Sequence, residues 1–417
     1  MNRKIVVSID LNGTTFRVGT LWSRTKNHRE SASFEYHSEW LASPERFALE
    51  PALSLGEGAF HTPNQFSLFG SMGDSAPDRW GRILMKRAHA RKAKEQGETP
   101  RALSEIDYLL GVNDFSRQGA LRFSEGEEGA FLFADTKSNI PPLVNLPKLL
   151  NASNKFMSSN EDDEDLRLLL APGSSLGGAR PKATVVDQKG NLCIAKFPRK
   201  DDSFKVVEWE AVALTLAEKA GLRVPVWFLE KIGEAPVLIL QKFDREGDIR
   251  IPFLSAMSMI GAADYEQRSY LEIAASLIEY GSRPKEDLEE LWRRIIFTIL
   301  ISNTDDHMRN HGFLYEKQQG WRLSPVYDVN PTSQEDKPRI LSTCIDYEDS
   351  TASLDTAMSV VKEFRVEKKR AEEIVREVAQ AASQWEAVAQ SFGIKKKERE
   401  RMSSAFCHSD MDKALSI

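Results

Sequence analysis

The most apolar segment of the chain is short. Residues Ile295–Ile301 form a seven-residue run that is already interrupted by Thr298, whereas a helix that crosses a bilayer needs about 20 apolar residues. The run ends a pattern that repeats every 3.6 residues from Glu286, which predicts a helix buried in a protein core. We therefore expect a globular protein with no membrane segment.

Composition narrows the class further. The 417 residues include 56 Lys and Arg and 62 Asp and Glu, a formal charge of −6, with 41% hydrophobic and 28% charged residues. This length predicts two or three ordinary globular domains. The mild acidity disfavours broad nucleic-acid binding, which requires a clustered basic surface. The three cysteines are too scattered for a disulfide framework or a zinc site. They favour a cytoplasmic location, and the charged N-terminus lacks the core of a signal peptide.

Local patterns divide the chain into three segments. Two β-rich runs flank Asn12-Gly13 and predict a hairpin, and helical spacing begins near Pro77. A Gly-, Glu- and Ser-rich stretch from about Ser124 to Pro142 marks a domain edge. Strand patterns then flank one helix, and helical patterns dominate from Ser269. We predict an α+β protein with an N-terminal subdomain over 1–130, a β-rich small lobe over 131–245 and a helical lobe over 246–417.

Five elements that carry chemistry follow one another in the second half. They are, in order, a Ser- and Gly-rich loop over 174–182, Lys196 in the strand CIAKF, Glu210 in a helix, the stretch NTDDHMRN over 303–310, and Asp328 after a strand. Phosphoryl transfer from ATP needs this inventory, because backbone N–H groups and a lysine contact phosphates, a glutamate orients the lysine, and an aspartate accepts the hydroxyl proton. Asp305 and Asn310 are five positions apart, as in the catalytic loop H-R-D-x-x-x-x-N of protein kinases. Asn310 and Asp328 offer the oxygen ligands that Mg²⁺ prefers.

The motifs also resemble one family. The stretches SSLGGARPK, IAKFP, LQKFDR, SNTDDHMRNHGFL and SPVYDVNP resemble the HipA-type serine/threonine kinases, which are toxins of bacterial toxin–antitoxin pairs, and so do GDSAPDRWGRILMKR and IDYLLGVNDFSRQGALRF. The resemblance runs from about residue 14 to 390, with the motifs in the family's order. It implies a bilobal kinase-like fold preceded by an additional N-terminal α/β subdomain.

The resemblance also assigns roles to residues. Asp305 matches the catalytic base, Lys196 the phosphate lysine, and Asn310 and Asp328 the metal ligands, with ATP and Mg²⁺ as cofactors. Ser175 matches a loop serine that family members autophosphorylate. The wider nucleotide-binding set is Ser174, Ser175, Gly177, Gly178, Ala179, Arg180, Lys182, Lys196, Gln241, Lys242, Phe243 and His307. One departure is Asp306, which stands where the family usually has Gly, so two adjacent carboxylates compete for the role of base. The position in the motif favours Asp305.

Each residue also has a plainer interpretation. Lys196 could extend from its strand into solvent, Glu210 could belong to a solvated helix face, and the Ser/Gly loop could be a linker. Asp305, Asn310 and Asp328 could cap helices or turns. His307 could be a structural histidine as well as a phosphate contact.

The function that we expect is a growth-inhibiting, ATP-dependent serine/threonine kinase. The resemblance implies a helix-turn-helix antitoxin of the HipB type as partner, with DNA contacted only through it. It also implies a protein substrate; the best-known one in the family is an aminoacyl-tRNA synthetase, but nothing in these residues selects it. A small-molecule kinase of the same fold and a non-catalytic corepressor bound to an antitoxin are the alternatives.

Overall fold

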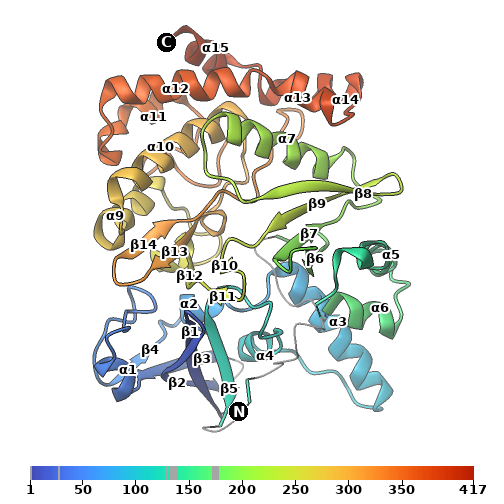
Figure 1. Cartoon of the computed structure of the whole chain (residues 1–417), viewed down its shortest axis with the longest axis vertical. Coiled ribbons are helices and arrows are strands. Elements are labelled where there is room, and N and C mark those ends of the chain that lie inside the picture. The colour runs from blue at the N-terminus through green and yellow to red at the C-terminus, as the bar shows by residue number, and fades with distance from the viewer. Residues whose placement is uncertain (1, 27–28, 127–129, 132–139, 171–177) are drawn as a thin grey trace. The chain divides into compact units, whose positions relative to one another are not determined.

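The computed structural model describes residues 2–26, 29–126, 130–131, 140–170 and 178–417. The chain forms two compact units, which we call the first unit (1–200 and 230–254) and the second unit (201–229 and 255–417). The chain therefore enters the second unit, returns to the first, and then completes the second. Helices and strands occur in both units (Figure 1), which confirms the expected α+β class.

The first unit begins with an antiparallel sheet. Its strands, in spatial order, are β4 (Ala59–His61), β3 (Arg29–Tyr36), β2 (Thr14–Lys26), β1 (Asn2–Leu11) and β5 (Leu121–Glu125). Leu11 pairs with Thr14, and the turn between them has Asn12 at φ 53° and Gly13 at φ 79°. Positive φ at both central residues defines the tight turn that suits a twisted hairpin. The predicted N-terminal hairpin is confirmed.

Between β3 and β5 the chain forms the helices α1 (Ser38–Ala42), α2 (Gly70–Gly73), α3 (Arg79–Glu95) and α4 (Glu105–Leu110). The side chain of Asp78 accepts a hydrogen bond from the N–H of Gly81 and caps α3. At α4, Ser104 and Asp107 exchange both bonds of a capping box. Both helices begin close to where the Pro77 and Ser104 signals predict them.

A second sheet of the first unit carries the lysine strand. Its order is β6 (Lys182–Val186), β7 (Leu192–Lys196), β9 (Ala235–Gln241) and β8 (Trp227–Ile232). Helices α5 (Leu146–Met157) and α6 (Asp163–Leu170) bury Leu149, Phe156 and Leu166 in one hydrophobic cluster with the inward side chains of β6, β7 and β9. Three short strands follow, namely β10 (Arg245–Glu246), β11 (Ile249–Arg250) and β12 (Phe253–Ser255).

The second unit is mostly helical. Its helices are α7 (Val206–Lys219), α8 (Ala256–Met259), α9 (Tyr270–Tyr280), α10 (Pro284–Leu300), α11 (Leu354–Ser359), α12 (Lys368–Ala382), α13 (Trp385–Ser391), α14 (Lys396–Met402) and α15 (Ser409–Ser416). The hairpin of β13 (Gly312–Glu316) and β14 (Gly320–Leu323) pairs Phe313 with Leu323.

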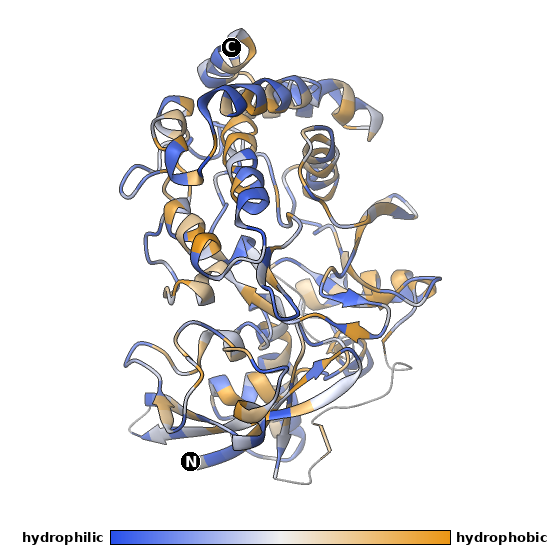
Figure 2. Ribbon diagram, turned by 60° about the vertical axis from the view of Figure 1, so that its left-hand side comes forward, coloured by the Kyte–Doolittle hydropathy of each residue, from blue (hydrophilic) through white to orange (hydrophobic). Residues whose placement is uncertain are grey.

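Helix α10 forms the centre of this unit, as its apolar pattern predicts. Every residue from Glu290 to Leu300 is buried, and the helix packs against α9 and α12. Helices of the unit carry both hydrophilic and hydrophobic stretches (Figure 2), which is typical of helices that cover a core with one face. Among the described residues, no helix is both long enough and apolar enough to cross a membrane.

Candidate catalytic and nucleotide site

The loop that follows α10 is firmly anchored to the second unit. Ser302 adopts φ 52°, which turns the chain sharply out of the helix. The Ser302 hydroxyl donates to the carbonyl of Ala405 over 2.9 Å, and the Asn303 N–H donates to the carbonyl of Thr298 over 2.9 Å. The hydroxyl of Thr304 bonds that of Thr332 at 3.1 Å. These bonds fix the entrance of the loop that carries Asp305 and Asn310.

The two adjacent carboxylates of this loop lie in different environments. Asp305 is exposed, whereas Asp306 is buried. The Asp306 Oδ2 accepts hydrogen bonds from the Tyr270 hydroxyl at 2.5 Å and from His311 Nε2 at 3.1 Å. Burial on its own would raise the pKa of Asp306, but the charge of His311 and these two hydrogen bonds hold it below its usual value. Asp305 is thus the carboxylate that can reach a substrate.

Asn310 is oriented by the loop itself. Its side-chain Nδ2 donates to the carbonyl of Asp305 over 3.1 Å, and its backbone N–H donates to the carbonyl of His307 over 2.8 Å. The other side-chain atom, Oδ1, is buried and has no hydrogen-bond partner. A buried acceptor without a donor is costly, and an amide oxygen is a suitable ligand for a hard cation. The orphaned Oδ1 therefore fits the predicted role of Asn310 as a metal ligand.

Asp328 lies in the segment after β14 and has an unusual backbone. Its φ is 58°, in the left-handed region that few residues other than glycine adopt. The residues around it bond to the Asp305 loop: the Tyr327 hydroxyl donates to the carbonyl of Arg309 over 2.7 Å, and the Asn330 N–H donates to Asn303 Oδ1 over 3.3 Å. The second unit thus joins the backbone around Asp328 to the loop of Asp305 and Asn310. Backbone strain of this kind is often found at functional sites.

These residues offer a small set of metal ligands. Among the described residues, no group of three or more His, Cys, Asp and Glu could hold a metal ion. Magnesium does not need such a cage, because it keeps several waters and binds through one or two protein oxygens together with substrate phosphates. One carboxylate, Asp328, and one amide oxygen, from Asn310, fit that pattern.

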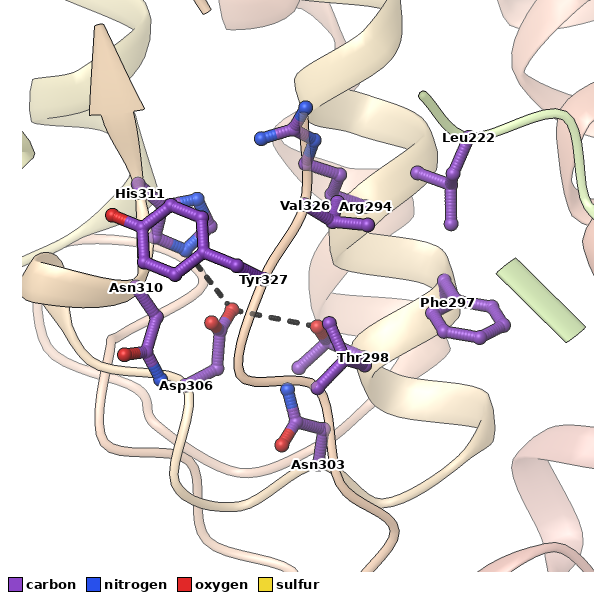
Figure 3. A pocket seen from close by; sticks show the side chains of 11 residues that line it. Leu222, Arg294, Phe297, Thr298, Asn303, Asp306, Asn310, His311, Val326 and Tyr327 are labelled. Carbon is purple, nitrogen blue, oxygen red and sulfur yellow. Dashed lines mark hydrogen bonds and ion pairs between the residues drawn. The ribbon is translucent and has the colours of Figure 1, made fainter. Parts of the chain in front are cut away.

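A small cavity lies behind the loop (Figure 3). It has a volume of about 20 Å³, and its polar lining comes from Thr298, Asn303, Asp306, Asn310 and His311. In the close-up, the carboxylate of Asp306 points between His311 and Thr298 and is joined to both. This space is sufficient for one water molecule, which needs two to four polar partners. The cavity is too small for a nucleotide. It lies among the side chains that hold the loop in place.

The first unit carries the predicted phosphate-binding residues. Lys196 ends β7, where it pairs with Lys182 on one side and Leu238 on the other, and it is half-buried. Of the Ser/Gly loop, Gly178 and Ala179 are exposed and Arg180 is half-buried, while Ser174, Ser175 and Gly177 lie outside the described residues. Their nucleotide-binding roles stay predictions.

The base of the Ser/Gly loop is tied to α3. The Lys182 ammonium is buried and binds the Asp78 carboxylate at 2.9 Å. The indole N–H of Trp80 donates to the Lys182 carbonyl over 2.9 Å, and the Trp80 backbone N–H donates to the Gly178 carbonyl over 3.3 Å. Sequence reasoning missed Asp78 and Trp80 as supports of the loop. Their motif, GDSAPDRWGR, was visible, but nothing in it indicates a partner about 100 residues away.

Gln241, Lys242 and Phe243 match the family's hinge segment, which contacts adenine, and their side chains differ in burial. Gln241 and Phe243 are half-buried, whereas Lys242 is buried and its ammonium bonds Gln118 Oε1 at 2.7 Å. The Lys242 N–H donates to the carbonyl of Leu192 over 2.9 Å, so this amide is already used within the sheet. Burial lowers the pKa of Lys242 to about 8, although the nearby Asp244 opposes that shift. If the segment meets adenine, the Lys242 side chain and N–H are not the contacting groups.

The roles predicted for Glu210 and His307 stay predictions. Glu210 is buried on α7 of the second unit, and Lys196 belongs to the first unit; the pairing between them stays a prediction. His307 is half-buried, and its Nδ1 has no hydrogen-bond partner, which leaves that nitrogen available. Tyr270 and His311, which hold Asp306, were not predicted. Tyr270 lies 36 positions before Asp306 in the sequence, and a histidine directly after Asn310 does not by itself identify Asp306 as its partner.

Together these features are typical of a kinase-like protein. One unit is built on β-sheets and carries a lysine at the end of a strand; the other is helical and carries the Asp–Asn loop and an aspartate with a strained backbone. Residues 174–385 match the family described as the HipA-like C-terminal domain. The match spans half of the chain, and the chain belongs to this family.

Curated relatives carry kinase names. A Haemophilus influenzae protein named "Putative kinase" is 26% identical over 180 residues, which are 37% of this chain and 52% of that protein. "Putative kinase Y4dM" of Sinorhizobium fredii is 30% identical over 159 residues, 34% of this chain and 38% of that protein. The aligned region thus spans about half or less of the length of these relatives.

A solved structure shares the fold. The structure described as the Shewanella oneidensis MR-1 toxin–antitoxin system HipA, HipB and operator DNA complex matches with a TM-score of 0.64 at 14% identity, over 98% of this chain and 96% of that chain. The match confirms the expected HipA-type fold. At this identity it speaks to fold alone.

Proposed function

We propose that the chain is an ATP- and Mg²⁺-dependent serine/threonine-protein kinase that acts as the growth-inhibiting toxin of a toxin–antitoxin pair. The observation that carries the proposal is the division of roles within one loop. Asp305 is exposed, Asn310 turns an unpartnered oxygen inward, and the segment of Asp328 is bonded to the same loop. These features support phosphoryl transfer, because its catalysis depends on positioning and electrostatics.

Each residue has a defined task in the proposed reaction. Asp305 would accept the proton of the substrate hydroxyl at a carboxylate oxygen and orient that hydroxyl towards the γ-phosphate. Lys196 would contact phosphate oxygens. Asn310 and Asp328 would hold Mg²⁺, which when bound offsets the negative charge of the transferring phosphoryl group.

The catalytic assignment is tested by charge-neutral substitutions. The chain of 417 residues is incubated with ATP labelled at the γ-phosphate, Mg²⁺ and bacterial lysate protein. We expect Asp305→Asn and Asp328→Asn each to lower label transfer to protein by at least about 100-fold. Thermal unfolding should change little for Asp305→Asn, because that side chain is exposed. Relief of growth arrest on expression should parallel the loss of transfer.

A matched control and three contrary outcomes complete this test. Asp412→Asn replaces an exposed aspartate on α15 and should leave transfer unchanged. Wild-type transfer by Asp305→Asn would show that the base is assigned wrongly. Label recovered only in a small molecule would identify a small-molecule kinase, and absence of ATP binding by calorimetry would favour the non-catalytic corepressor.

We further propose that Ser175 is autophosphorylated and that a helix-turn-helix antitoxin of the HipB type binds the chain. The first proposal follows from the family resemblance of SSLGGARPK, and the second from the fold shared with a protein whose structure includes HipB and operator DNA. Mass spectrometry after incubation with ATP should find phosphate on Ser175, and Ser175→Ala should remove it. Unmodified Ser175 in a protein that phosphorylates its substrate would contradict the first proposal.

A further inference from the structure

We propose that Asp306 is a positioning residue whose carboxylate, held by Tyr270 and His311, fixes the conformation in which Asp305 and Asn310 act. The inference rests on the proposed kinase function and extends it to a residue that stands where the family usually has Gly. Asp306 itself touches no substrate in this mechanism, because its side chain is buried behind the loop. Its effect reaches the reaction through its two catalytic neighbours.

One carboxylate oxygen joins three elements around the loop. Oδ2 of Asp306 receives the Tyr270 hydroxyl at 2.5 Å, His311 Nε2 at 3.1 Å and the Thr298 hydroxyl at 3.4 Å. Tyr270 is the first residue of α9, Thr298 lies in α10, and His311 directly precedes β13. Figure 3 shows the Asp306 carboxylate between two of these partners, His311 and Thr298. The middle of the loop is therefore fixed to the rigid part of the second unit.

The main chain at Asp306 is held as well. Its carbonyl accepts the Thr343 hydroxyl over 2.6 Å. On the other side of Asp305, the Thr304 carbonyl accepts the Ser342 hydroxyl over 2.9 Å. With Asp306 turned inward and both flanking carbonyls occupied, the side chain of Asp305 is left on the exposed side of the loop.

Asp306 also constrains the position of Asn310, through two sets of hydrogen bonds. The Asp305 carbonyl accepts the Asn310 Nδ2, so the backbone that Asp306 holds also orients the amide group. The next residue after Asn310 is His311, whose ring is bonded to Asp306 and whose carbonyl accepts the Ala256 N–H over 2.8 Å. Release of Asp306 would therefore loosen the proposed base and the proposed metal ligand together.

Tyr270 and His311 are matched to an acidic residue at this position. An ionised carboxylate only accepts hydrogen bonds, and it accepts from a phenol and an imidazole, both of which are buried. Glycine at 306 would remove the carboxylate that accepts from both of these buried donors, and an unmet buried hydrogen-bonding group is destabilising. The three residues thus form one unit in this chain.

The experiment measures phosphate transfer and folding for the same variants of the 417-residue chain. We expect Asp306→Asn to lower kcat by about 10- to 100-fold. The KM for ATP should rise by a smaller factor, because the lysine strand is untouched and only the proposed metal ligand Asn310 is loosened. Tyr270→Phe removes one hydroxyl and should lower kcat in the same direction but less. In the double variant the second substitution should add little, since both break one link.

A control variant at a second buried carboxylate distinguishes loss of positioning from general loss of stability. Asp287 in the second unit is fully buried and bonds Arg223, Arg322 and the Leu323 N–H. Asp287→Asn should lower the melting temperature while leaving kcat per folded molecule at the wild-type value. If Asp306→Asn is poorly folded, Tyr270→Phe decides the question alone, because it deletes a single oxygen atom.

Three results would overturn the inference. Wild-type kcat per folded molecule in Asp306→Asn or in a folded Tyr270→Phe would exclude a positioning role. Complete loss in Asp306→Asn combined with retained transfer in Asp305→Asn would make Asp306 the base. Absence of transfer by the wild-type chain would contradict the proposed function itself, and with it the role that depends on it.

Discussion

At the scale of single residues, identical side chains have opposite environments within a few positions. Asp305 is exposed and Asp306 buried. The five-residue spacing to Asn310 favours Asp305 as the base, but it does not show which of the two carboxylates faces solvent. The motif identifies the residues but not the direction of each side chain, because direction depends on partners such as Tyr270 that are distant in sequence. Lys242 is a second example, because its position in the sequence does not reveal that its ammonium binds Gln118.

Glu50 gives a pH-dependent prediction at this scale. It is buried, accepts the Ser71 N–H, and burial raises its pKa from 4.5 to about 7. Between pH 4.5 and 7 the folded state therefore binds more protons than the unfolded state, so this group lowers stability as pH rises through that window. Glu50→Gln should raise the free energy of unfolding by roughly 1–3 kcal/mol at pH 8 and change it little at pH 4.

Urea unfolding of the wild type and the variant at both pH values provides the measurement. Comparing the two proteins at each pH cancels the other groups that titrate. Glu57→Gln, which replaces an exposed glutamate of the same segment, should leave stability unchanged at both values. A Glu50→Gln effect of equal size at pH 4 and pH 8 would contradict the assignment.

At the scale of elements, sequence patterns predicted turns, caps and helices correctly, but they did not predict contacts between elements that are distant in sequence. The Asn12-Gly13 turn and the Ser104 capping box formed as predicted, because turns and caps are decided by residues a few positions apart. Helix α10 formed where its apolar period placed it. The link of α3 to the lysine sheet could not be predicted, because Asp78 and Lys182 are 104 positions apart and the sequence analysis assigns Lys182 to nucleotide binding.

That link yields a prediction about stability. The Asp78–Lys182 pair is buried, with exposed side-chain fractions of 7% and 3%, and Asp78 also caps α3. Asp78→Asn keeps a capping oxygen but leaves a buried ammonium unpaired, so we expect a loss of about 3–5 kcal/mol. Lys182→Met in the same background should recover much of that loss, because both charges are then gone.

Chemical denaturation of the two single variants and the double variant measures the coupling. Lys368→Met breaks an exposed pair with Glu372 on α12 and should cost less than about 1 kcal/mol. Additive effects of Asp78→Asn and Lys182→Met would mean that the two side chains do not interact in solution.

At the scale of the whole molecule, the second unit is assembled from two separate stretches of chain. Trp209 of α7, in the earlier stretch, is buried and stacks on Phe406 at 6.2 Å between ring centroids, and Trp385 stacks on Phe406 at 4.9 Å. Glu398 accepts the Lys205 N–H at 2.8 Å and the Trp209 indole N–H at 3.0 Å. The sequence suggested a helical lobe beginning at 246, and it gave no sign that α7 completes this core.

Truncation tests this arrangement. A fragment of residues 255–417 lacks α7, so its aromatic core is uncovered, and we expect it to bind a hydrophobic dye and to unfold without a sharp transition. Joining residues 201–229 to it through a long Gly/Ser linker should restore cooperative unfolding. In the full chain, Trp209→Ala should cost about 3–5 kcal/mol. Cooperative unfolding of the fragment by itself, followed by circular dichroism, would contradict the expectation.

The split of this helical core has a consequence for the order in which the molecule is made. The ribosome synthesises α7 well before Trp385 and Phe406, so the nascent helix cannot make these aromatic contacts until both residues have emerged. Ala405, whose carbonyl accepts the Ser302 hydroxyl at the start of the Asp305 loop, is synthesised in the same later stretch. The loop proposed to carry the catalytic base can therefore gain this anchor only after that stretch has been made.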